Sequence, residues 1–317
     1  MEIDGEESSN IEDRRDGGGG GGGGGGFGVG GLGGGMGGSG FGIPMGGGLF
    51  KGGFGLIAVV VVALVLGVDP MALLGGLGGS GGTTQQVAPQ PRQAARPAGD
   101  DPERRFVALV LKSTELVWEQ QFKELGRQYA APTLVLFRNQ TPTACGTGQT
   151  AMGPFYCPGD RKAYIDLAFF DELATRFNAP GRFPQAYVLA HEVGHHVQNL
   201  LGISGKVQQM RQSMSKRDGN ALSVRTELQA DCFAGVWAYH AARQVDGVRV
   251  KIGEQDVDQA LAAASSIGDD RLQKQAQGRV VPDSFTHGSS AQRVRWFKAG
   301  LENGDVRRCD TFKAQQL

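Results

Sequence analysis

The sequence predicts an α+β fold with a helical majority, in one domain that spans residues 101–317. Two short apolar runs typical of strands come before the central helices, and most other apolar residues of this region repeat at helical spacing. Glycine is concentrated elsewhere, because 34 of the 53 glycines lie within residues 1–82. The region after residue 100 therefore has the composition of an ordinary folded domain.

The N-terminal residues 1–51 are acidic at first and then rich in glycine. Glycine has no side chain to bury and loses the most backbone entropy on ordering. The glycine run also lacks the three-residue period of collagen. We therefore expect residues 1–51 to form a disordered arm without a packed core.

Residues 52–68 contain no charged side chain and would form a helix of about 25 Å, the short end of what crosses a bilayer. A signal peptide would lie nearer the N-terminus behind a basic flank, so we expect one transmembrane helix in the lipid bilayer. Lys51 precedes the segment, whereas the next basic residue after it is Arg92. The positive-inside rule then predicts a single-pass protein of the cell membrane, with a cytoplasmic N-terminus and the folded domain outside. Residues 69–100, rich in Gly, Pro and Gln, are typical of a flexible linker.

The folded domain begins with a predicted helix at residues 106–129, which follows the start signal Asp101-Pro102-Glu103. Residues 132–138 and 162–167 predict two short buried strands. Residues 171–177 predict a short helix.

Four further helices are expected at residues 185–201, 224–243, 256–265 and 291–301. Gly202 lies just past the first of them, in the position where glycine commonly ends a helix. Residues 204–222 are polar and charged and predict no regular element.

The charges of the chain balance. Lys and Arg together number 32, as do Asp and Glu. A nucleic-acid-binding protein would show a basic surplus or a basic patch, and the glycine-rich arm has no Arg-Gly-Gly repeat. No nucleic-acid partner is expected.

The predicted helix at residues 185–201 contains His191, Glu192 and His195 in the order His-Glu-x-x-His. Residues four apart lie on one face of a helix, so the two imidazoles can bind one metal ion. Glu192 lies beside them, close enough to take a proton from water, which makes it the candidate catalytic base. The spacing predicts a Zn²⁺ site that hydrolyses its substrate.

A catalytic zinc site needs a third protein ligand and an open position. A third ligand on the same stretch would require a glycine and a histidine where the chain has Gln198 and Leu201. The predicted helix at residues 224–243 offers Glu227 and Asp231 at positions i and i+4 instead. We expect Glu227 to be the ligand and Asp231 to accept the free ring N–H of a ligand histidine, with Asp231 as the alternative ligand.

Four longer stretches carry a resemblance to a known family. They are GPFYCPGDRKAYID, HEVGHHVQNLLG, RTELQADCFAGVWA and DSFTHGSSAQRVRWFKAG. Together with the glycine-rich arm they resemble the YpfJ-type neutral zinc metallopeptidase family. The resemblance implies a membrane-anchored bacterial peptidase with a zincin-like, gluzincin-type domain, one Zn²⁺ per chain and a peptide or protein substrate. In that pattern His191, His195 and Glu227 bind zinc, and Glu192 is the base.

The oxyanion that forms during peptide hydrolysis needs a further hydrogen-bond donor. We expect His287 to supply it, with Tyr164 and Arg293 as alternative donors; His287 would then be a structural histidine at a helix N-terminus. His196 follows the second predicted ligand and is rotated about 100° away from the metal face of the helix. We expect His196 and His240 to be structural.

Peptide substrates of such folds add as a strand to an exposed sheet edge, for which residues 162–167 or the turn between Cys145 and Cys157 are the candidates. The four cysteines allow three pairings. We favour Cys145 with Cys157 and Cys232 with Cys309, while a buried free thiol at Cys232 is the alternative.

Two functions of different classes are compatible with these features. The first is a membrane-tethered zinc endopeptidase, and the second is a non-catalytic binding or assembly module with the same fold. An intact Glu192 favours the first, because a purely structural zinc site has no use for a base. A third function, an adhesive protein built on the glycine-rich arm, would not need the ordered domain.

Overall fold

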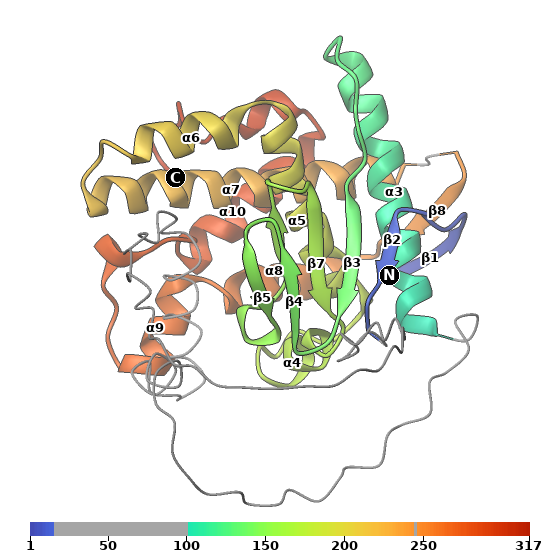
Figure 1. The fold of residues 1–317 in the computed structure, drawn as a ribbon, viewed down its shortest axis with the longest axis horizontal. Coiled ribbons are helices and arrows are strands. Elements are labelled where there is room, and N and C mark those ends of the chain that lie inside the picture. The colour runs from blue at the N-terminus through green and yellow to red at the C-terminus, as the bar shows by residue number, and fades with distance from the viewer. Residues whose placement is uncertain (16–100, 244–245) are drawn as a thin grey trace, which may run out of the picture.

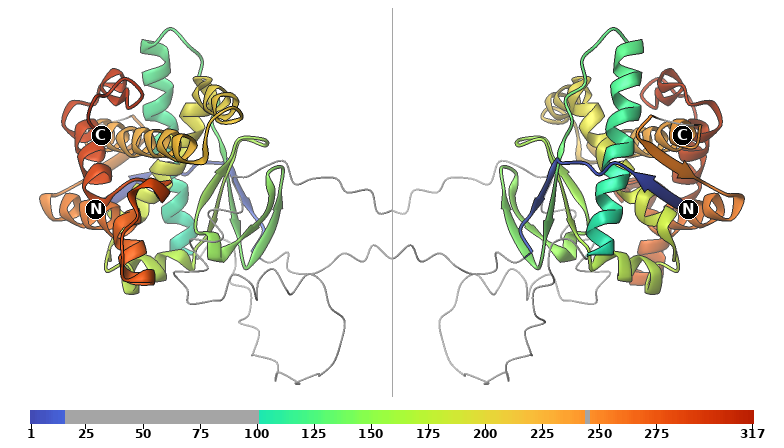
Figure 2. Two further views of the ribbon diagram at one scale, coloured as in Figure 1. Left: turned by 90° about the vertical axis from the view of Figure 1, so that its left-hand side faces the viewer. Right: turned by 90° about the vertical axis from the view of Figure 1, so that its right-hand side faces the viewer.

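The computed structural model of the chain describes residues 1–15, 101–243 and 246–317 (Figure 1). It is a helix-rich α+β fold, as predicted. The strands of the main sheet lie on one side of the molecule and most of the C-terminal helices on the other (Figure 2). The helix that carries the His-Glu-x-x-His motif, α5 (Arg182–Leu200), contacts both the sheet and the helices. The predicted metal site therefore lies between the two layers.

The main sheet has the strand order β2-β3-β7-β6. Its central strands β3 (Thr133–Phe137) and β7 (Lys162–Asp166) are parallel and almost wholly buried, as their apolar sequences predict. β6 (Phe155–Cys157) pairs antiparallel with β7 and forms one edge. A separate hairpin of β4 (Gln140–Thr143) and β5 (Gly146–Gln149) follows β3.

Residues 1–15 belong to the folded domain. β1 (Glu2–Gly5) pairs antiparallel with β8 (Val248–Lys251), and β2 (Ile11–Asp13) pairs in parallel with β3 and forms the other edge of the main sheet. Polar contacts add to this pairing. The Met1 amine forms an ion pair with Asp256, Ser8 and Asn10 donate to Glu115, and Lys162 donates to Glu12.

The expectation of a disordered arm over residues 1–51, with the domain confined to residues 101–317, is therefore wrong for residues 1–15. Strand pairing uses backbone hydrogen bonds, and Met1, Ile3 and Ile11 are the large apolar side chains of this segment that pack against the core, too few for a recognisable pattern. A short polar segment beside a glycine run accordingly carries no hydrophobic pattern. Residues 16–51 lie outside the described residues.

The strand pairing bears on the predicted membrane topology. The predicted transmembrane helix at residues 52–68 and the linker at residues 69–100 lie outside the described residues, and within the described ranges no helix is long and apolar enough to cross a membrane. β1 and β2 pair with strands that follow residue 100, so residues 1–15 and 101–317 must share one compartment. A single crossing between them would separate them. The predicted cytoplasmic N-terminus with an outside domain therefore conflicts with this pairing.

Most predicted helices are present with shifted ends. The first is α3 (Pro102–Glu124), which the Asp101 carboxylate caps by accepting the backbone N–H groups of Glu103 and Arg104. α5 is followed by Gly202 in the left-handed conformation, as predicted. The remaining helices near their predicted ranges are α4 (Phe169–Thr175), α7 (Lys216–Ala241), α8 (Glu254–Ser266) and α10 (Ser290–Asn303).

The sequence did not predict the helices α6 (Ile203–Arg211) and α9 (Asp269–Gln277). α6 buries Val207, and α9 buries the polar side chains of Asp269 and Gln273. α6 has only Ile203, Val207 and Met210 at helical spacing, and α9 only Leu272 as a large apolar residue, so both helices lack the longer apolar repeat of the predicted ones. Short 3-10 turns complete the fold at Thr150–Met152, Pro282–Ser284 and Val306–Cys309.

α7 and α10 lie side by side (Figure 1) and approach closely. A Cβ atom at Gly235 would lie 2.1 Å from the Phe297 carbonyl oxygen, and one at Gly300 would lie 2.0 Å from the Cys232 carbonyl oxygen. Both distances are far below van der Waals contact, so any side chain here would force the helices apart.

Both favoured disulfides are present, Cys145–Cys157 and Cys232–Cys309. The alternative of a free thiol at Cys232 is therefore wrong. The second disulfide fastens the C-terminal tail to α7, the helix that carries two of the predicted site residues.

Candidate metal centre

α5 and α7 place the predicted site residues opposite each other. A Cβ atom at Gly194 of α5 would lie 2.9 Å from the Ala230 carbonyl oxygen of α7, so the close approach of the two helices depends on this glycine. The glycine inside the His-Glu-Val-Gly-His sequence thus has a packing role. The residues brought together are His191, Glu192 and His195 from α5 and Glu227 and Asp231 from α7.

Three of these side chains converge. The Nε2 atoms of His191 and His195 lie 3.2 and 3.5 Å from the same oxygen of Glu227, Oε2. The ligand atoms of the three residues all lie within 4.8 Å of one another. Two imidazoles and one carboxylate are a donor set that suits Zn²⁺ and leaves a fourth position for water or substrate. The residues present therefore fit a zinc ion, with Glu227 rather than Asp231 beside the histidines.

Asp231 lies behind His191. Its Oδ1 is 2.9 Å from Nδ1 of His191 and accepts a hydrogen bond of 2.5 Å from the Tyr187 hydroxyl. Arg293 donates to both carboxylate oxygens, at 2.8 and 2.9 Å. Burial raises the pKa of Asp231, but Arg293 and His191 outweigh it and lower this pKa to about 2. The ionised Asp231 accepts the Nδ1–H of His191, which leaves Nε2 of His191 free to bind a metal.

His195 is held by a neutral group. Its Nδ1 lies 2.9 Å from Oε1 of Gln198, which is wholly buried. The sequence prediction used Gln198 only to exclude a third ligand on the same stretch and assigned it no role. The available signal was its spacing, because residues i and i+3 of one helix lie close enough for their side chains to interact.

Glu192 lies beside the three converging groups and is 8% exposed. Its carboxylate makes no hydrogen bond to another residue that the structure describes. Burial raises the pKa of Glu192, and the charges of His191 and His195 oppose this in part. A carboxylate with a raised pKa and no fixed partner can accept a proton and release it again.

The electrostatics around His191, His195 and Glu227 favour binding of a cation. Burial lowers the pKa of His195, but Glu227 and the Gln198 hydrogen bond outweigh it and raise this pKa to about 9. Burial raises the pKa of Glu227, but the two histidines hold it well below its usual value. His195 and Glu227 therefore hold a proton tightly between them, at the position that a metal ion would occupy.

His287 lies in the loop between α9 and α10. Its Nδ1 is 3.2 Å from Oδ1 of Asp269, and its side chain is 35% exposed. The other oxygen of Asp269 accepts three consecutive backbone N–H groups, those of Thr286, His287 and Gly288, at 2.7–3.1 Å. Burial lowers the pKa of His287, but Asp269 and the charge of Glu227 raise it. The ring is thus held at Nδ1, while its charge acts on the metal group.

The two alternative donors are engaged elsewhere. Arg293 is bound to Asp231, and the Tyr164 hydroxyl donates to Asp160 at 2.7 Å. In the described parts of the chain, Nε2 of His287 makes no hydrogen bond to another residue. Of the three candidate donors, His287 is therefore the one with an unengaged nitrogen.

His196 and His240 are structural, as predicted. Nδ1 of His196 lies 2.9 Å from the Tyr156 hydroxyl and Nε2 lies 2.6 Å from the Ala130 carbonyl oxygen. Burial lowers the pKa of His196 to about 4, so the ring is neutral. His240 contacts the carbonyl oxygen of Gly304 at 2.8 Å.

The sheet has one edge next to α5. β7 pairs with β3 on one side and, through Lys162, Ala163 and Tyr164, with β6 on the other, so these three residues of the predicted edge at 162–167 cannot pair with an additional strand. β6 lies at the edge, within the loop that the Cys145–Cys157 disulfide closes, which was the other candidate. Tyr156 of β6 contacts His196 of α5, so this edge lies beside the helix that bears the predicted ligands.

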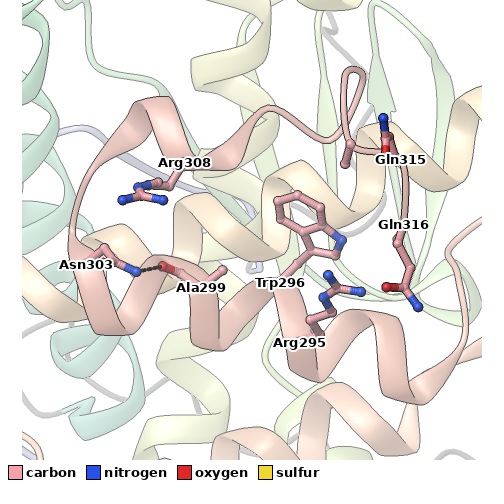
Figure 3. A pocket seen from close by; sticks show the side chains of 8 residues that line it. Arg295, Trp296, Ala299, Asn303, Arg308, Gln315 and Gln316 are labelled. Carbon is pink, nitrogen blue, oxygen red and sulfur yellow. Dashed lines mark hydrogen bonds between the residues drawn. The ribbon is translucent and has the colours of Figure 1, made fainter.

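A pocket of about 360 Å³ lies away from these residues, between α10 and the C-terminal tail (Figure 3). None of its lining residues belongs to the metal group, so we do not assign it to the candidate active site. They are Arg295, Trp296, Ala299, Asn303, Arg308, Ala314, Gln315 and Gln316.

Comparison with known families agrees with the geometry of the metal centre. A family described as "Putative neutral zinc metallopeptidase" matches residues 2–312 of the chain. The chain belongs to this family. The resemblance that four sequence stretches predicted is thereby confirmed, and the match includes the strands β1 and β2 of the N-terminal segment. Membership of this family implies a zinc peptidase with a peptide or protein substrate.

Two relatives show how far this similarity extends. YpfJ of Escherichia coli strain K12, described as an uncharacterised protein, is 50% identical over 262 residues, which cover 83% of this chain and 87% of YpfJ. Mb2605 of Mycobacterium bovis, described in the same way, is 44% identical over 261 residues, which cover 80% and 86% of the two chains. No solved structure matches the chain.

Proposed function

We propose that the protein is a zinc endopeptidase whose metal ion is held by His191, His195 and Glu227. The observation that carries this proposal is the buried Glu192 carboxylate, which has no hydrogen-bond partner among the described residues and lies beside three converging ligand atoms. A structural site would have no use for such a group. When bound, zinc would polarise the scissile carbonyl and lower the pKa of water towards about 7.

Glu192 moves the proton. Its carboxylate takes a proton from the attacking water and later gives it to the leaving amine. The burial that raises the pKa of Glu192 supports both steps, because a carboxyl with an ordinary acidic pKa would be a weaker base.

His287 stabilises the developing oxyanion. Asp269 fixes its Nδ1 and raises its pKa, so the ring carries a proton on Nε2 that it can donate. A positioned donor of this kind contributes about 10²–10³ in rate. The side chain is 35% exposed, so an incoming substrate can reach the ring.

The substrate pairs with β6 as an added strand. β6 is the edge of the main sheet next to α5, and backbone hydrogen bonds would hold an extended peptide there. Such pairing recognises a stretch of chain rather than a terminus, which favours cleavage of internal bonds.

The described residues act outside the cytoplasm. Two disulfides support an oxidising compartment. Since residues 1–15 and 101–317 pair in one fold, both ends of the chain then lie outside together. Attachment to the membrane would come from residues 52–68, and a single crossing by them is incompatible with this arrangement. Reporters active only outside the cytoplasm, fused before residue 1 and after residue 317, should both be active, whereas one active and one silent fusion would support a single crossing.

The substitution Glu192→Gln tests the proposed function. It keeps the size of the side chain and removes its basicity, so the full chain should keep its zinc and lose cleavage of an unbiased peptide library. The alternative, a non-catalytic binding module, predicts that the wild-type chain binds zinc but cleaves nothing, and that cells tolerate Glu192→Gln.

A further inference from the structure

A chain of hydrogen bonds leads from the C-terminal tail to His195. The Cys309 carbonyl oxygen accepts from Nε2 of Gln229 at 2.8 Å, and Oε1 of Gln229 accepts from Nε2 of Gln198 at 3.2 Å. Oε1 of Gln198 lies 2.9 Å from Nδ1 of His195. We propose that the Cys232–Cys309 disulfide, acting through Gln229 and Gln198, positions His195 for zinc. This inference rests on the proposed zinc site.

Backbone carbonyl oxygens, which can only accept, fix the orientation of each amide in this series of hydrogen bonds. The Cys309 carbonyl oxygen accepts at one end, so the amide NH₂ of Gln229 must face it and Oε1 must face Gln198. The carbonyl oxygen of Thr226 accepts from Nε2 of Gln198 at 2.7 Å, which turns Oε1 of Gln198 towards His195. Nδ1 of His195 must then carry the proton, and Nε2 keeps the lone pair that binds metal.

Burial makes this arrangement costly to change. Gln198 is wholly buried and Gln229 is 5% exposed. Water cannot easily replace a missing partner here, so an unpaired buried amide is unfavourable. If Cys309 shifts, Gln229 loses its fixed orientation and Gln198 is held by the Thr226 carbonyl oxygen alone. His195 then gains access to the tautomer that cannot bind zinc through Nε2.

The disulfide fixes the end of the chain of hydrogen bonds. Cys232 and Gln229 are three residues apart on α7 and lie on the same side of that helix. The bond to Cys309 therefore holds the Cys309 carbonyl oxygen opposite Gln229. The tail has further contacts with α7, because Arg225 donates to the carbonyl oxygens of Thr311 and Ala314. These contacts keep the tail near α7, whereas the disulfide sets the position of Cys309.

The test measures the zinc affinity of the full chain by competition with a chromophoric chelator. Gln198→Met and Gln229→Met keep the volume and remove the hydrogen bonds. Each should weaken zinc binding by about tenfold, the lower range for groups that orient a ligand. Removing the disulfide by Cys232→Ser with Cys309→Ser should have a similar effect. Unchanged zinc affinity in the variant without the disulfide, or in either glutamine variant, would overturn the proposal.

Two controls separate positioning from loss of stability. Gln121→Met removes a buried amide of α3 whose side chain contacts Glu124, and it should lower the melting temperature of the metal-free chain without changing zinc affinity. Removing the other disulfide, by Cys145→Ser with Cys157→Ser, should also leave zinc affinity unchanged. If these controls weaken zinc binding as much as Gln198→Met does, the effect is one of general stability and the proposal is wrong.

A combined variant tests whether the disulfide acts through the glutamines. In the Gln198→Met background, removing Cys232–Cys309 should weaken zinc binding no further, because the connection is already broken. Two independent tenfold losses would contradict the connection. A wild-type chain that binds no zinc would instead overturn the proposed function, so the two failures are distinguishable.

Discussion

The two histidines of the metal centre are held in opposite ways. Behind His191 lies a charged group, in which Asp231 is bound to Arg293 and Tyr187. Behind His195 lies a neutral group, in which Gln198 is connected through Gln229 to the C-terminal tail. Ionised partners hold His191 in place, whereas the position of His195 depends on where the C-terminal tail is attached to α7.

The largest expected effect is on the charged side. Asp231→Ala leaves the buried Arg293 without a partner and frees Nδ1 of His191. We expect the free energy of unfolding of the metal-free chain to fall by about 3–5 kcal/mol and zinc affinity to fall by about 100-fold. Chemical denaturation and chelator competition measure the two quantities.

The matched control for this substitution is Asp310→Ala, which breaks an exposed ion pair with Lys313. Solvent screens an exposed pair of this kind, so the substitution should leave the free energy of unfolding almost unchanged. If Asp231→Ala weakened zinc binding less than Gln198→Met, the two sides would not differ as described.

The sequence predicted Asp231 on the charged side but not its partners Arg293 and Tyr187, and it missed the neutral side for a physical reason. Glu227 and Asp231 are carboxylates at helical spacing after a His-Glu-x-x-His motif, so their chemistry identifies them. Gln198 and Gln229 are polar helix residues that could equally face water, and only the tertiary structure shows that they are buried. Residues 1–15 were missed because strand pairing through the backbone leaves no apolar pattern.

His287 belongs to neither side, and its substitution separates catalysis from metal binding. His287→Ala should lower kcat/KM by about 10²–10³, or about 2.7–4 kcal/mol, because the oxyanion loses its donor. Zinc affinity should not fall, because the substitution removes a positive charge near Glu227 and no predicted ligand; chelator competition measures it. A variant with wild-type kcat/KM would show that the donor lies elsewhere.

Gly194 serves both sides, since it sets the distance between α5 and α7. Gly194→Ala introduces a contact of 2.9 Å with the Ala230 carbonyl oxygen and should destabilise the chain by about 1–3 kcal/mol. Both histidines then move away from Glu227, so zinc binding weakens as well. Gly205→Ala is the control, because that helical position has no atom within 4 Å. It should leave zinc affinity unchanged and slightly raise stability.

The last expected effect is the gradual dependence of zinc affinity on pH. The pKa of His195 is raised to about 9 in the metal-free chain, so below pH 9 zinc must displace a proton from this ring. Zinc affinity should therefore fall as the pH falls, by about tenfold per unit for one proton, between pH 9 and pH 7. An affinity independent of pH over this range would show that His195 is not protonated before zinc binds.

The most direct test of the account is the zinc content of the purified full chain and of Glu227→Gln, measured after dialysis against a weak chelator. The account predicts one zinc ion per wild-type chain and almost none in Glu227→Gln, because the carboxylate that both histidines face has been lost. Equal zinc content in the two proteins, or no zinc in the wild type, would contradict a metal centre formed by α5 and α7.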